Sequence, residues 1–202
     1  MLIILEGADG VGTTTQAALL FKHLLHSYPN TRPVLTAEPS STPVGHLIRS
    51  LLKDAASFSA VEMAALFFVD RKAHFRDIIR PALEKDHWVI CDRNWQSSLV
   101  YQGLIASLED TNFVKLLNQQ FAIPDSVCYI LDVPVAETAR RRRARGTHPE
   151  AYETDAIQEK VLAAYRRVPE HDPTAVLLSC ANKSAVAVHQ ELVAHLEPFL
   201  IA

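Results

Sequence analysis

The chain lacks the features that place many proteins in a class at first sight. Its 202 residues include only three cysteines, and no C-x-x-C pair or other metal-ligand spacing is present. Cys91 and Cys128 sit inside apolar runs and Cys180 ends one. An odd number of cysteines at strand-like positions predicts reduced, buried thiols in a cytoplasmic protein, and it argues against disulfides.

Positive charge and long apolar runs are scarce as well. The chain has 20 Lys and Arg residues against 23 Asp and Glu residues, a formal net charge of −3, whereas a nucleic-acid scaffold is usually basic. No apolar run approaches the length of a membrane span. The opening MLIILEG has neither the basic segment nor the cleavage site of a signal peptide. We therefore expect neither nucleic acid nor membrane as a partner.

The sequence does contain a regular alternation of short apolar runs and helical patterns. Hydrophobic residues make up 49% of the chain, which is enough for an ordinary core. The apolar runs predict buried strands at 2–5, 33–36, 88–91, 127–133 and 175–178. Helical spacing occurs at 14–26, 43–52, 59–83, 97–105, 111–121, 135–145, 156–167 and 184–196. This alternation predicts an α/β fold in one domain over 1–202, with a five-stranded parallel sheet and helices on both faces.

A glycine-rich stretch, GADGVGTTTQ at 7–16, joins the first predicted strand to the first predicted helix. It fits the phosphate-loop motif G-x-x-x-x-G-K-[ST] at Gly7, Gly12 and Thr14, but Thr13 stands where the lysine belongs. Glycine lets backbone N–H groups approach a phosphate, and the helix adds its positive N-terminal end. A plain glycine turn is the alternative, but the order of the parts favours a P-loop NTPase. The predicted ATP-binding residues are Gly7, Ala8, Asp9, Gly10, Val11, Gly12, Thr13, Thr14 and Thr15.

The missing lysine predicts a replacement cation, because a threonine hydroxyl cannot neutralise phosphate charge. Removing one preorganised donor from a transition state can cost on the order of 10²–10³ in rate. The run RRRRAR at 140–145 is the obvious source of such a cation. A solvated helix face is the usual meaning of a charge run, yet four consecutive arginines point around most of a helix, so at least one must face its neighbour. We expect an arginine-rich lid at about 140–155.

Two further charged pairs stand near apolar segments. Asp92 and Arg93 follow a predicted strand, and ligands of open parallel sheets bind at the carboxyl ends of strands. There Asp92 and Thr14 could hold Mg²⁺, and Arg93 could grip a substrate phosphate; a local ion pair is the alternative. Phe67-Phe68 precedes Asp70-Arg71 inside a predicted helix. Aromatic residues at such positions belong to the core more often than they stack on a base.

These motifs together resemble the thymidylate kinase family, within the P-loop nucleoside monophosphate kinases, over nearly the full chain. Each segment is weak evidence alone, but the ordered set is highly specific. The matching segments are EGADGVG at 6–12, TAEPSSTPVG at 36–45, LFFVDR at 66–71, IRPAL at 79–83, WVICDR at 88–93, SSLVYQG at 97–103, the pair PD at 124–125 and YILDV at 129–133.

The resemblance implies that the chain transfers a phosphoryl group from ATP to dTMP with Mg²⁺, as a cytoplasmic homodimer. It implies that Asp9 contacts the sugar 3′-hydroxyl near the transferred phosphate and that Arg93 holds the dTMP phosphate. Family members without a basic residue inside the loop often carry catalytic arginines in the lid. The implied catalytic residues are therefore Asp9, Arg93, Arg143 and Arg145.

The same resemblance implies a dTMP pocket. Phe67 would stack on thymine, Arg71 would bond the edge of the base, and Tyr101 would lie beneath the sugar and disfavour a 2′-hydroxyl. Ser98 and Gln102 would reach the base. The implied substrate-binding residues are Asp9, Glu38, Phe67, Arg71, Arg93, Ser98, Tyr101 and Gln102.

Three departures from the family pattern keep other hypotheses open. Thr13 replaces the loop lysine, Ala37 replaces the arginine of the T-R-E-P motif, and Asn94 replaces the aromatic residue that usually follows Asp-Arg. Two of these changes remove a cation that faces the phosphates. The chain could therefore be a nucleotide-binding protein with little or no kinase activity. It could also be a kinase for another pyrimidine monophosphate, such as dUMP.

Overall fold

The computed structural model of the protein describes residues 1–53, 58–119, 126–145 and 155–200. All neighbouring strands of the sheet in these residues are parallel, in the order β2-β3-β1-β4-β5. The predicted five-stranded α/β fold is confirmed, and each strand end lies within one residue of its predicted place. The strands are β1 Leu2–Glu6, β2 Val34–Ala37, β3 Val89–Asp92, β4 Ser126–Asp132 and β5 Ala175–Ser179.

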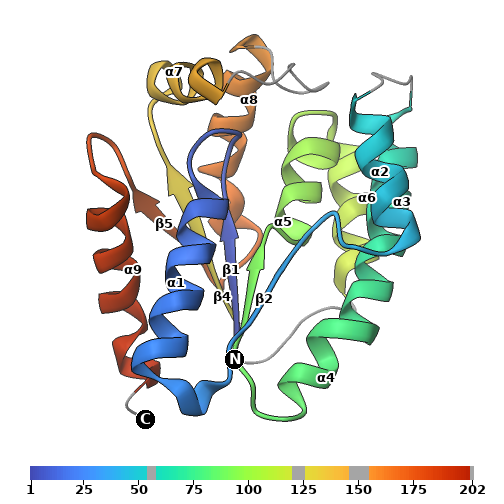
Figure 1. The fold of residues 1–202 in the computed structure, drawn as a ribbon. Helices are drawn as coiled ribbons and strands as arrows, with labels where there is room; N and C mark the ends of the chain where they lie inside the picture. The colour runs from blue at the N-terminus through green and yellow to red at the C-terminus, as the bar shows by residue number, and fades with distance from the viewer. Residues whose placement is uncertain (54–57, 120–125, 146–154, 201–202) are drawn as a thin grey trace.

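Helices cover both faces of this sheet, as predicted. In Figure 1, α1 and α9 lie on one side and α2, α3, α5 and α6 lie on the other, while α7 lies beyond the carboxyl ends of the strands. The helices are α1 Thr13–Ser27, α2 Pro43–Lys53, α3 Ala60–His74, α4 Arg80–Leu83, α5 Trp95–Ser98, α6 Leu108–Asn118, α7 Val135–Arg145, α8 Asp155–Tyr165 and α9 Ala185–Leu200. Short 3₁₀ turns occupy Pro29–Thr31 and Val168–Glu170.

The long helix predicted at 59–83 is interrupted by a π-turn. It begins with a capping box, in which Ser59 and Glu62 satisfy each other's backbone N–H groups. The α-helical part ends at His74, and the π-turn Phe75–Ile79 leads into α4. In a regular helix Pro81 would clash with the carbonyl four residues earlier, so a widened turn before it has a physical cause. The widened turn therefore lies ahead of the proline.

Several other helices differ from their predicted ranges, and α9 runs on to Leu200 where an end at 196 is predicted. The helix predicted at 97–105 is α5 followed by a second π-turn, Leu99–Leu104. The helix predicted at 111–121 begins earlier, at Leu108, because Ser107 caps it: the Ser107 Oγ accepts the Asp110 N–H at 3.0 Å. Its predicted end at 121 lies outside the described residues.

The core is centred on the three inner strands. Every residue of β1 is buried, which matches the near-continuous apolar runs of a sheet covered on both faces. The three cysteines are free and buried, as predicted. Leu5 of β1 is in register with Asp92 of β3, so the glycine-rich loop and the Asp92-Arg93 pair emerge side by side. Within the described residues, no helix is long and apolar enough to cross a membrane.

Candidate functional site

The loop after β1 has the backbone of a phosphate-binding loop. Gly7, Gly10 and Gly12 have positive φ angles of 151°, 91° and 107°. A Cβ atom on Gly7 would lie 2.7 Å from the side chain of Val11 and 2.8 Å from the carbonyl oxygen of Leu131, so the close approach there requires glycine. The helix α1 begins directly after Gly12. Its free N–H groups and its positive end therefore point at the loop.

The two residues predicted to hold Mg²⁺ lie together beside this loop. The Thr14 Oγ1 donates a hydrogen bond of 2.6 Å to Asp92 Oδ2. The other oxygen, Asp92 Oδ1, is buried and has no hydrogen-bond partner among the described residues. A hydroxyl and a carboxylate oxygen left without a donor are the hard oxygen ligands that Mg²⁺ prefers. These residues therefore fit the ion.

Arg93 stands at the carboxyl end of β3 in an unusual backbone conformation. Its φ angle is 71°, which is uncommon for a residue other than glycine. Its Nη2 donates to Asp9 Oδ1 at 2.7 Å, and its Nη1 donates to the Ser97 Oγ at 3.2 Å and the Tyr165 hydroxyl at 3.1 Å. The guanidinium is thus held from three sides while 20% of the side chain stays exposed. A strained position held so firmly is typical of a functional site.

Asp9 is the hub that joins the loop to this arginine. Besides Arg93, its carboxylate accepts hydrogen bonds from the Tyr101 hydroxyl at 3.0 Å and from Gln158 Nε2 at 3.0 Å. The Asp9 N–H donates to Gln158 Oε1 in return. Burial and the charge of Asp9 raise the pKa of Tyr101, so its hydroxyl stays a donor at neutral pH. The structure therefore brings three predicted residues, Asp9, Arg93 and Tyr101, into one network.

Glu6 is a buried carboxylate that shares hydrogen-bond partners with Arg93. It is fully buried, and its carboxylate accepts hydrogen bonds from the Asn94 N–H at 2.7 Å, the Ser97 Oγ at 2.7 Å and the Tyr165 hydroxyl at 2.9 Å. Burial raises the pKa of Glu6, and the nearby Arg93 and these hydrogen bonds oppose that rise. Ser97 and Tyr165 thus connect Glu6 to Arg93. Sequence reasoning missed Tyr165 and Gln158, both of which come from the distant helix α8.

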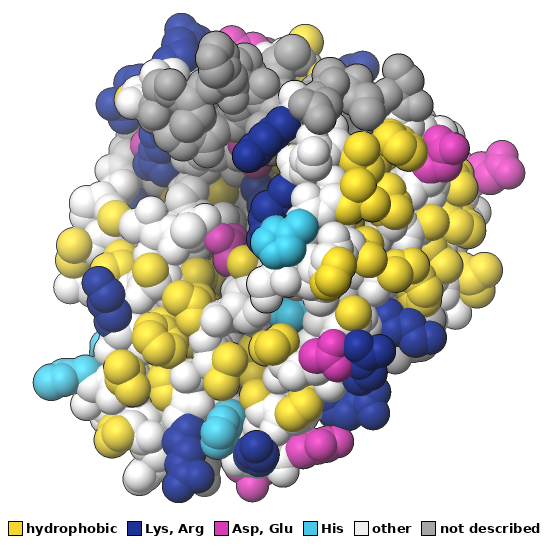
Figure 2. Space-filling model, turned by 45° about the vertical axis from the view of Figure 1, so that its right-hand side comes forward, with side chains coloured by type: hydrophobic (Ala, Val, Ile, Leu, Met, Phe, Trp, Pro, Cys, Tyr) yellow, Lys and Arg dark blue, Asp and Glu magenta, His cyan; other side chains and the backbone are white. Residues whose placement is uncertain are grey.

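A cavity of about 150 Å³ opens beside Asp9 and Arg93. Figure 2 shows basic side chains gathered in a recess at the centre of this face of the molecule. Seven of the eight substrate-binding residues predicted from the sequence line the cavity: Asp9, Glu38, Phe67, Arg71, Arg93, Tyr101 and Gln102. The eighth, Ser98, is buried and accepts a hydrogen bond of 3.2 Å from Arg71 Nη2.

Arg71 is fixed at the wall of this cavity by buried partners. Only 2% of its side chain is exposed, and its Nε donates to Glu38 Oε2 at 2.8 Å. Its Nη1 donates to Asn118 Oδ1 at 2.9 Å. Glu38 also contacts His74 Nδ1 at 3.1 Å, and the other ring nitrogen of His74 lies 2.6 Å from the Thr36 Oγ1. No local pattern of the sequence indicated the roles of His74 and Asn118.

The arginines of the predicted lid lie on α7 and differ in what they contact. Arg141 Nη1 donates to the carbonyl oxygen of Val11 in the phosphate loop at 2.9 Å, and Arg141 also pairs with Glu137 one turn earlier. Arg143 is 75% exposed, and its Nη2 lies 3.6 Å from Asp155 Oδ2 of α8. The Arg145 side chain and the lid residues 146–154 are outside the described residues. Of the described lid arginines, Arg141 is the one in contact with the loop.

A family model for thymidylate kinase matches residues 5–192. The chain belongs to the thymidylate kinase family. The match includes the phosphate loop, the walls of the cavity and most of the sheet, so the family resemblance seen in the motifs is confirmed.

Individual relatives and solved structures agree with the thymidylate kinase assignment. The chain is 36% identical over 208 residues to a "probable thymidylate kinase" of Thermococcus kodakarensis, covering 99% of this chain and 98% of the relative. It is 41% identical over 152 residues to a thymidylate kinase of Prochlorococcus marinus, covering 71% of each. A solved thymidylate kinase of Candida albicans superposes with a TM-score of 0.81 at 25% identity, over 98% of this chain and 91% of that one. These likenesses confirm the P-loop NTPase type of fold.

The departures from the thymidylate kinase pattern occupy defined places. Thr13 is 6% exposed at the start of α1, and its uncharged side chain supplies no cation to the loop. Ala37 ends β2 beside Asp92. Asn94 is 5% exposed and caps α5, its Oδ1 accepting the Trp95 N–H at 2.7 Å. The first two changes leave the glycine-rich loop and the neighbouring end of β2 with fewer cations than the family pattern has.

Proposed function

We propose that the chain transfers the γ-phosphoryl group of ATP to dTMP, giving dTDP and ADP, in the cytoplasm. The observation that carries the proposal is the cavity beside the phosphate loop, because it gathers seven residues that the family pattern assigns to dTMP. Phe67, an aromatic ring, and Arg71, a fixed guanidinium, line the same cavity as Arg93 and Asp9. The three free, buried cysteines fit a reducing compartment.

In this proposal, recognition of the base relies on groups that are already in place. Arg71 is held by Glu38, Asn118 and Ser98, so it needs little reordering when it donates to the edge of thymine. Phe67 supplies a face for stacking. Pre-positioned groups reduce the entropy cost of binding and keep the nucleotide in one orientation.

At the phosphate end, the work of the protein is positioning and charge neutralisation. Arg93 would donate to the dTMP phosphate, and Asp9 would keep the guanidinium in place and accept the 3′-hydroxyl of the sugar. Thr14 and Asp92 would hold Mg²⁺, which neutralises charge on the phosphates of ATP. The loop N–H groups and the N-terminus of α1 would bind the phosphates of ATP.

We assign the missing positive charge to the arginines of the lid. Arg143 and Arg145 are the residues that the family pattern favours. Arg141 joins them, because its guanidinium already reaches the loop beside the position where the lysine is missing. Closure of the lid over ATP would also exclude water and so limit hydrolysis.

A coupled ADP-release assay with ATP and Mg²⁺ tests the proposal, with dTMP, dUMP, UMP or no acceptor, and with separation of dTDP as product. Rapid turnover that depends on dTMP and stops when EDTA removes Mg²⁺ is the expected result. Binding of dTMP without turnover would instead support the nucleotide-binding hypothesis. Faster turnover of dUMP would support a different specificity; the Candida albicans relative is described as having broad substrate specificity.

A dimer is the second part of the proposal. In Figure 2, hydrophobic side chains gather on the side of the molecule that carries α2 and α3. Leu47, Val69, Leu108 and Leu116 are 48–77% exposed on α2, α3 and α6, and α3 contacts both neighbours. A contiguous apolar surface of this kind suits a second copy of the chain.

Sedimentation tests the dimer. The Val69→Glu variant should sediment as a monomer, whereas Leu25→Glu, which changes a similarly exposed apolar residue on α1, should leave the dimer intact. A monomeric wild-type chain at micromolar concentration would contradict the assignment.

A further inference from the structure

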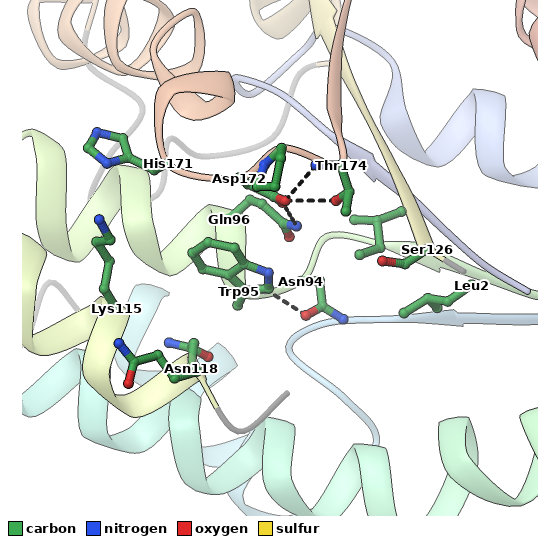
Figure 3. A pocket seen from close by; sticks show the side chains of 13 residues that line it. Leu2, Asn94, Trp95, Gln96, Lys115, Asn118, Ser126, His171, Asp172 and Thr174 are labelled. Carbon is green, nitrogen blue, oxygen red and sulfur yellow. Dashed lines mark hydrogen bonds between the residues drawn. The ribbon is translucent and has the colours of Figure 1, made fainter. Parts of the chain in front are cut away.

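A second, larger cavity of about 490 Å³ adjoins the first. Its wall combines the beginnings of β1 and β4, the turn of α5, the end of α6 and the segment before β5. In Figure 3, Lys115 lies on one side and Leu2 and Ser126 lie on the other, with Gln96 between them. Of the described residues, only Asn94 lines both cavities. The larger cavity is therefore separate from the residues assigned to dTMP and ATP.

A buried hydrogen-bond acceptor in this wall lacks a donor. Gln96 is 1% exposed, and its Nε2 donates to Asp172 Oδ2 at 2.7 Å. Its Oε1 is buried and has no partner among the described residues. Asp172 is already used, since it also accepts the N–H and Oγ1 of Thr174. A buried carbonyl oxygen without a donor costs free energy, and a ligand with an N–H group would remove that cost.

Two neighbouring groups in the same wall are also open to a ligand. Lys115 lines the cavity, and no ion pair between described residues includes it. His171 Nε2 is a second buried atom without a partner in the described chain. Burial and the charge of Lys115 lower the pKa of His171, so its ring is neutral at neutral pH and leaves Lys115 as the cation. An anionic group on a ligand would therefore pair with Lys115.

The remaining surface of the cavity is largely apolar. Leu2, Ile4, Trp95 and Pro173 line it. Asn94 borders it at the position where the thymidylate kinase pattern has an aromatic residue. An apolar wall with a few convergent polar groups is the usual form of a small-molecule site.

We propose that the larger cavity binds a flat aromatic carboxylate that carries a ring N–H. The ring lies against the apolar wall near Trp95, the N–H donates to Gln96 Oε1, and the carboxylate pairs with Lys115. The ligand makes no contact with the phosphate loop, so the assignment stands independently of the kinase activity.

Calorimetric titration of the full chain with indole-3-acetate tests this site. Two matched probes each lack one group: 1-naphthaleneacetate has no ring N–H, and 3-methylindole has no carboxylate. Each missing group should weaken binding by about tenfold, the effect expected for a buried hydrogen bond to a charged or unsatisfied partner. The absence of saturable binding by indole-3-acetate, or equal binding of all three probes, would overturn the proposal.

Variants locate the bound probe. Lys115→Met should abolish the preference for indole-3-acetate over 3-methylindole, and Gln96→Leu should abolish the preference over 1-naphthaleneacetate. Phe67→Ala, which alters only the smaller cavity, should leave binding unchanged. An equal loss in Phe67→Ala would place the probe in the smaller cavity and overturn the assignment. If Gln96→Leu does not fold, the Lys115→Met variant and the probe series still decide the question.

Discussion

The two ends of the smaller cavity are built in different ways. Arg71 and Glu38 form an ion pair in which the two side chains are only 2% and 3% exposed. At the phosphate loop, Thr13 and Ala37 stand where the family has cations, and Asp92 Oδ1 has no partner among the described residues. The first end has its charges paired without a ligand, whereas in the proposed function Mg²⁺ and the lid arginines would complete the second.

This difference matches what each end would bind in the proposed function. A base is neutral and rigid, so a fixed arginine and a fixed ring can recognise it at low cost in entropy. Phosphates bring several negative charges, and groups that neutralise them must be able to arrive with the ligand or close over it. If the proposed function holds, the comparison teaches that the base would meet groups already fixed in place, whereas the phosphates would depend on Mg²⁺ and the lid arginines for charge neutralisation.

The largest effect is expected at the phosphate end. Arg93→Met removes the only guanidinium that the described structure places against Asp9, and it should lower kcat/KM for dTMP by on the order of 10²–10³. Steady-state kinetics measure the loss. Arg93→Lys should recover only part of it, because lysine keeps the charge but cannot contact Asp9, Ser97 and Tyr165 at once. A loss below tenfold would remove Arg93 from the proposed phosphate site.

At the end of the cavity around Arg71, a substitution should lower the stability of the protein as well as the binding of dTMP. Arg71→Met leaves Glu38 buried without its main partner and should lower the free energy of unfolding by about 3–5 kcal/mol. Urea denaturation measures the change. Arg76→Met is the matched control, since Arg76 pairs with Asp77 at the surface of the same helical stretch, and it should leave the midpoint unchanged. Equal urea midpoints for Arg71→Met and Arg76→Met would show that the buried pair of Arg71 and Glu38 does not stabilise the fold more than a surface pair does.

Substitution of the lid arginines should have a smaller effect on turnover than substitution of Arg93. Arg141→Gln should lower kcat by about tenfold or more, because it removes the described lid cation in contact with the loop. Arg143→Gln, at a residue that is 75% exposed in this structure, measures how far lid closure brings a second arginine to the phosphates. If neither change affects turnover of an active enzyme, lid arginines do not replace the lysine.

The smallest effect lies away from both ends, between α1 and α9. Burial lowers the pKa of His189 from 6.5, and the neighbouring His23, with ring centroids 5.4 Å apart, lowers it further. The unfolded chain therefore binds this proton more readily than the folded chain. Stability that is present above pH 6.5 is lost as the pH falls through the folded pKa.

One variant tests whether His189 lowers the stability of the protein as the pH falls. His189→Gln should lose less stability than the wild type between about pH 7 and about pH 5, by a few tenths of a kcal/mol because the ring is partly screened by solvent. Thermal unfolding across that range measures the difference. His26→Gln, which changes an exposed histidine on α1, is the control. A steeper loss of stability with falling pH in His189→Gln than in the wild type would contradict the prediction.

Much of the site was accessible from the sequence because its residues sit in contiguous motifs. Asp9, Phe67, Arg71, Arg93, Tyr101 and Gln102 were placed by short segments that resemble the family, and the cavity collects them. The roles of Gln158 and Tyr165 were not accessible. Gln158 meets Asp9 across 149 positions of the chain, and the sequence around it carries only the pattern of an ordinary helix.

The strands, the loop and the order of the elements were determined by the sequence alone, because apolar runs, glycine positions and helical spacing act over a few neighbouring residues. Helix boundaries depended on local groups that are easily overlooked, such as the Ser107 cap and Pro81. Only the tertiary structure decided which arginine reaches the loop, what holds Arg71 and where a second cavity lies. Those features arise from packing and pairing between distant segments, where burial makes each contact strong and the sequence leaves no local trace of it.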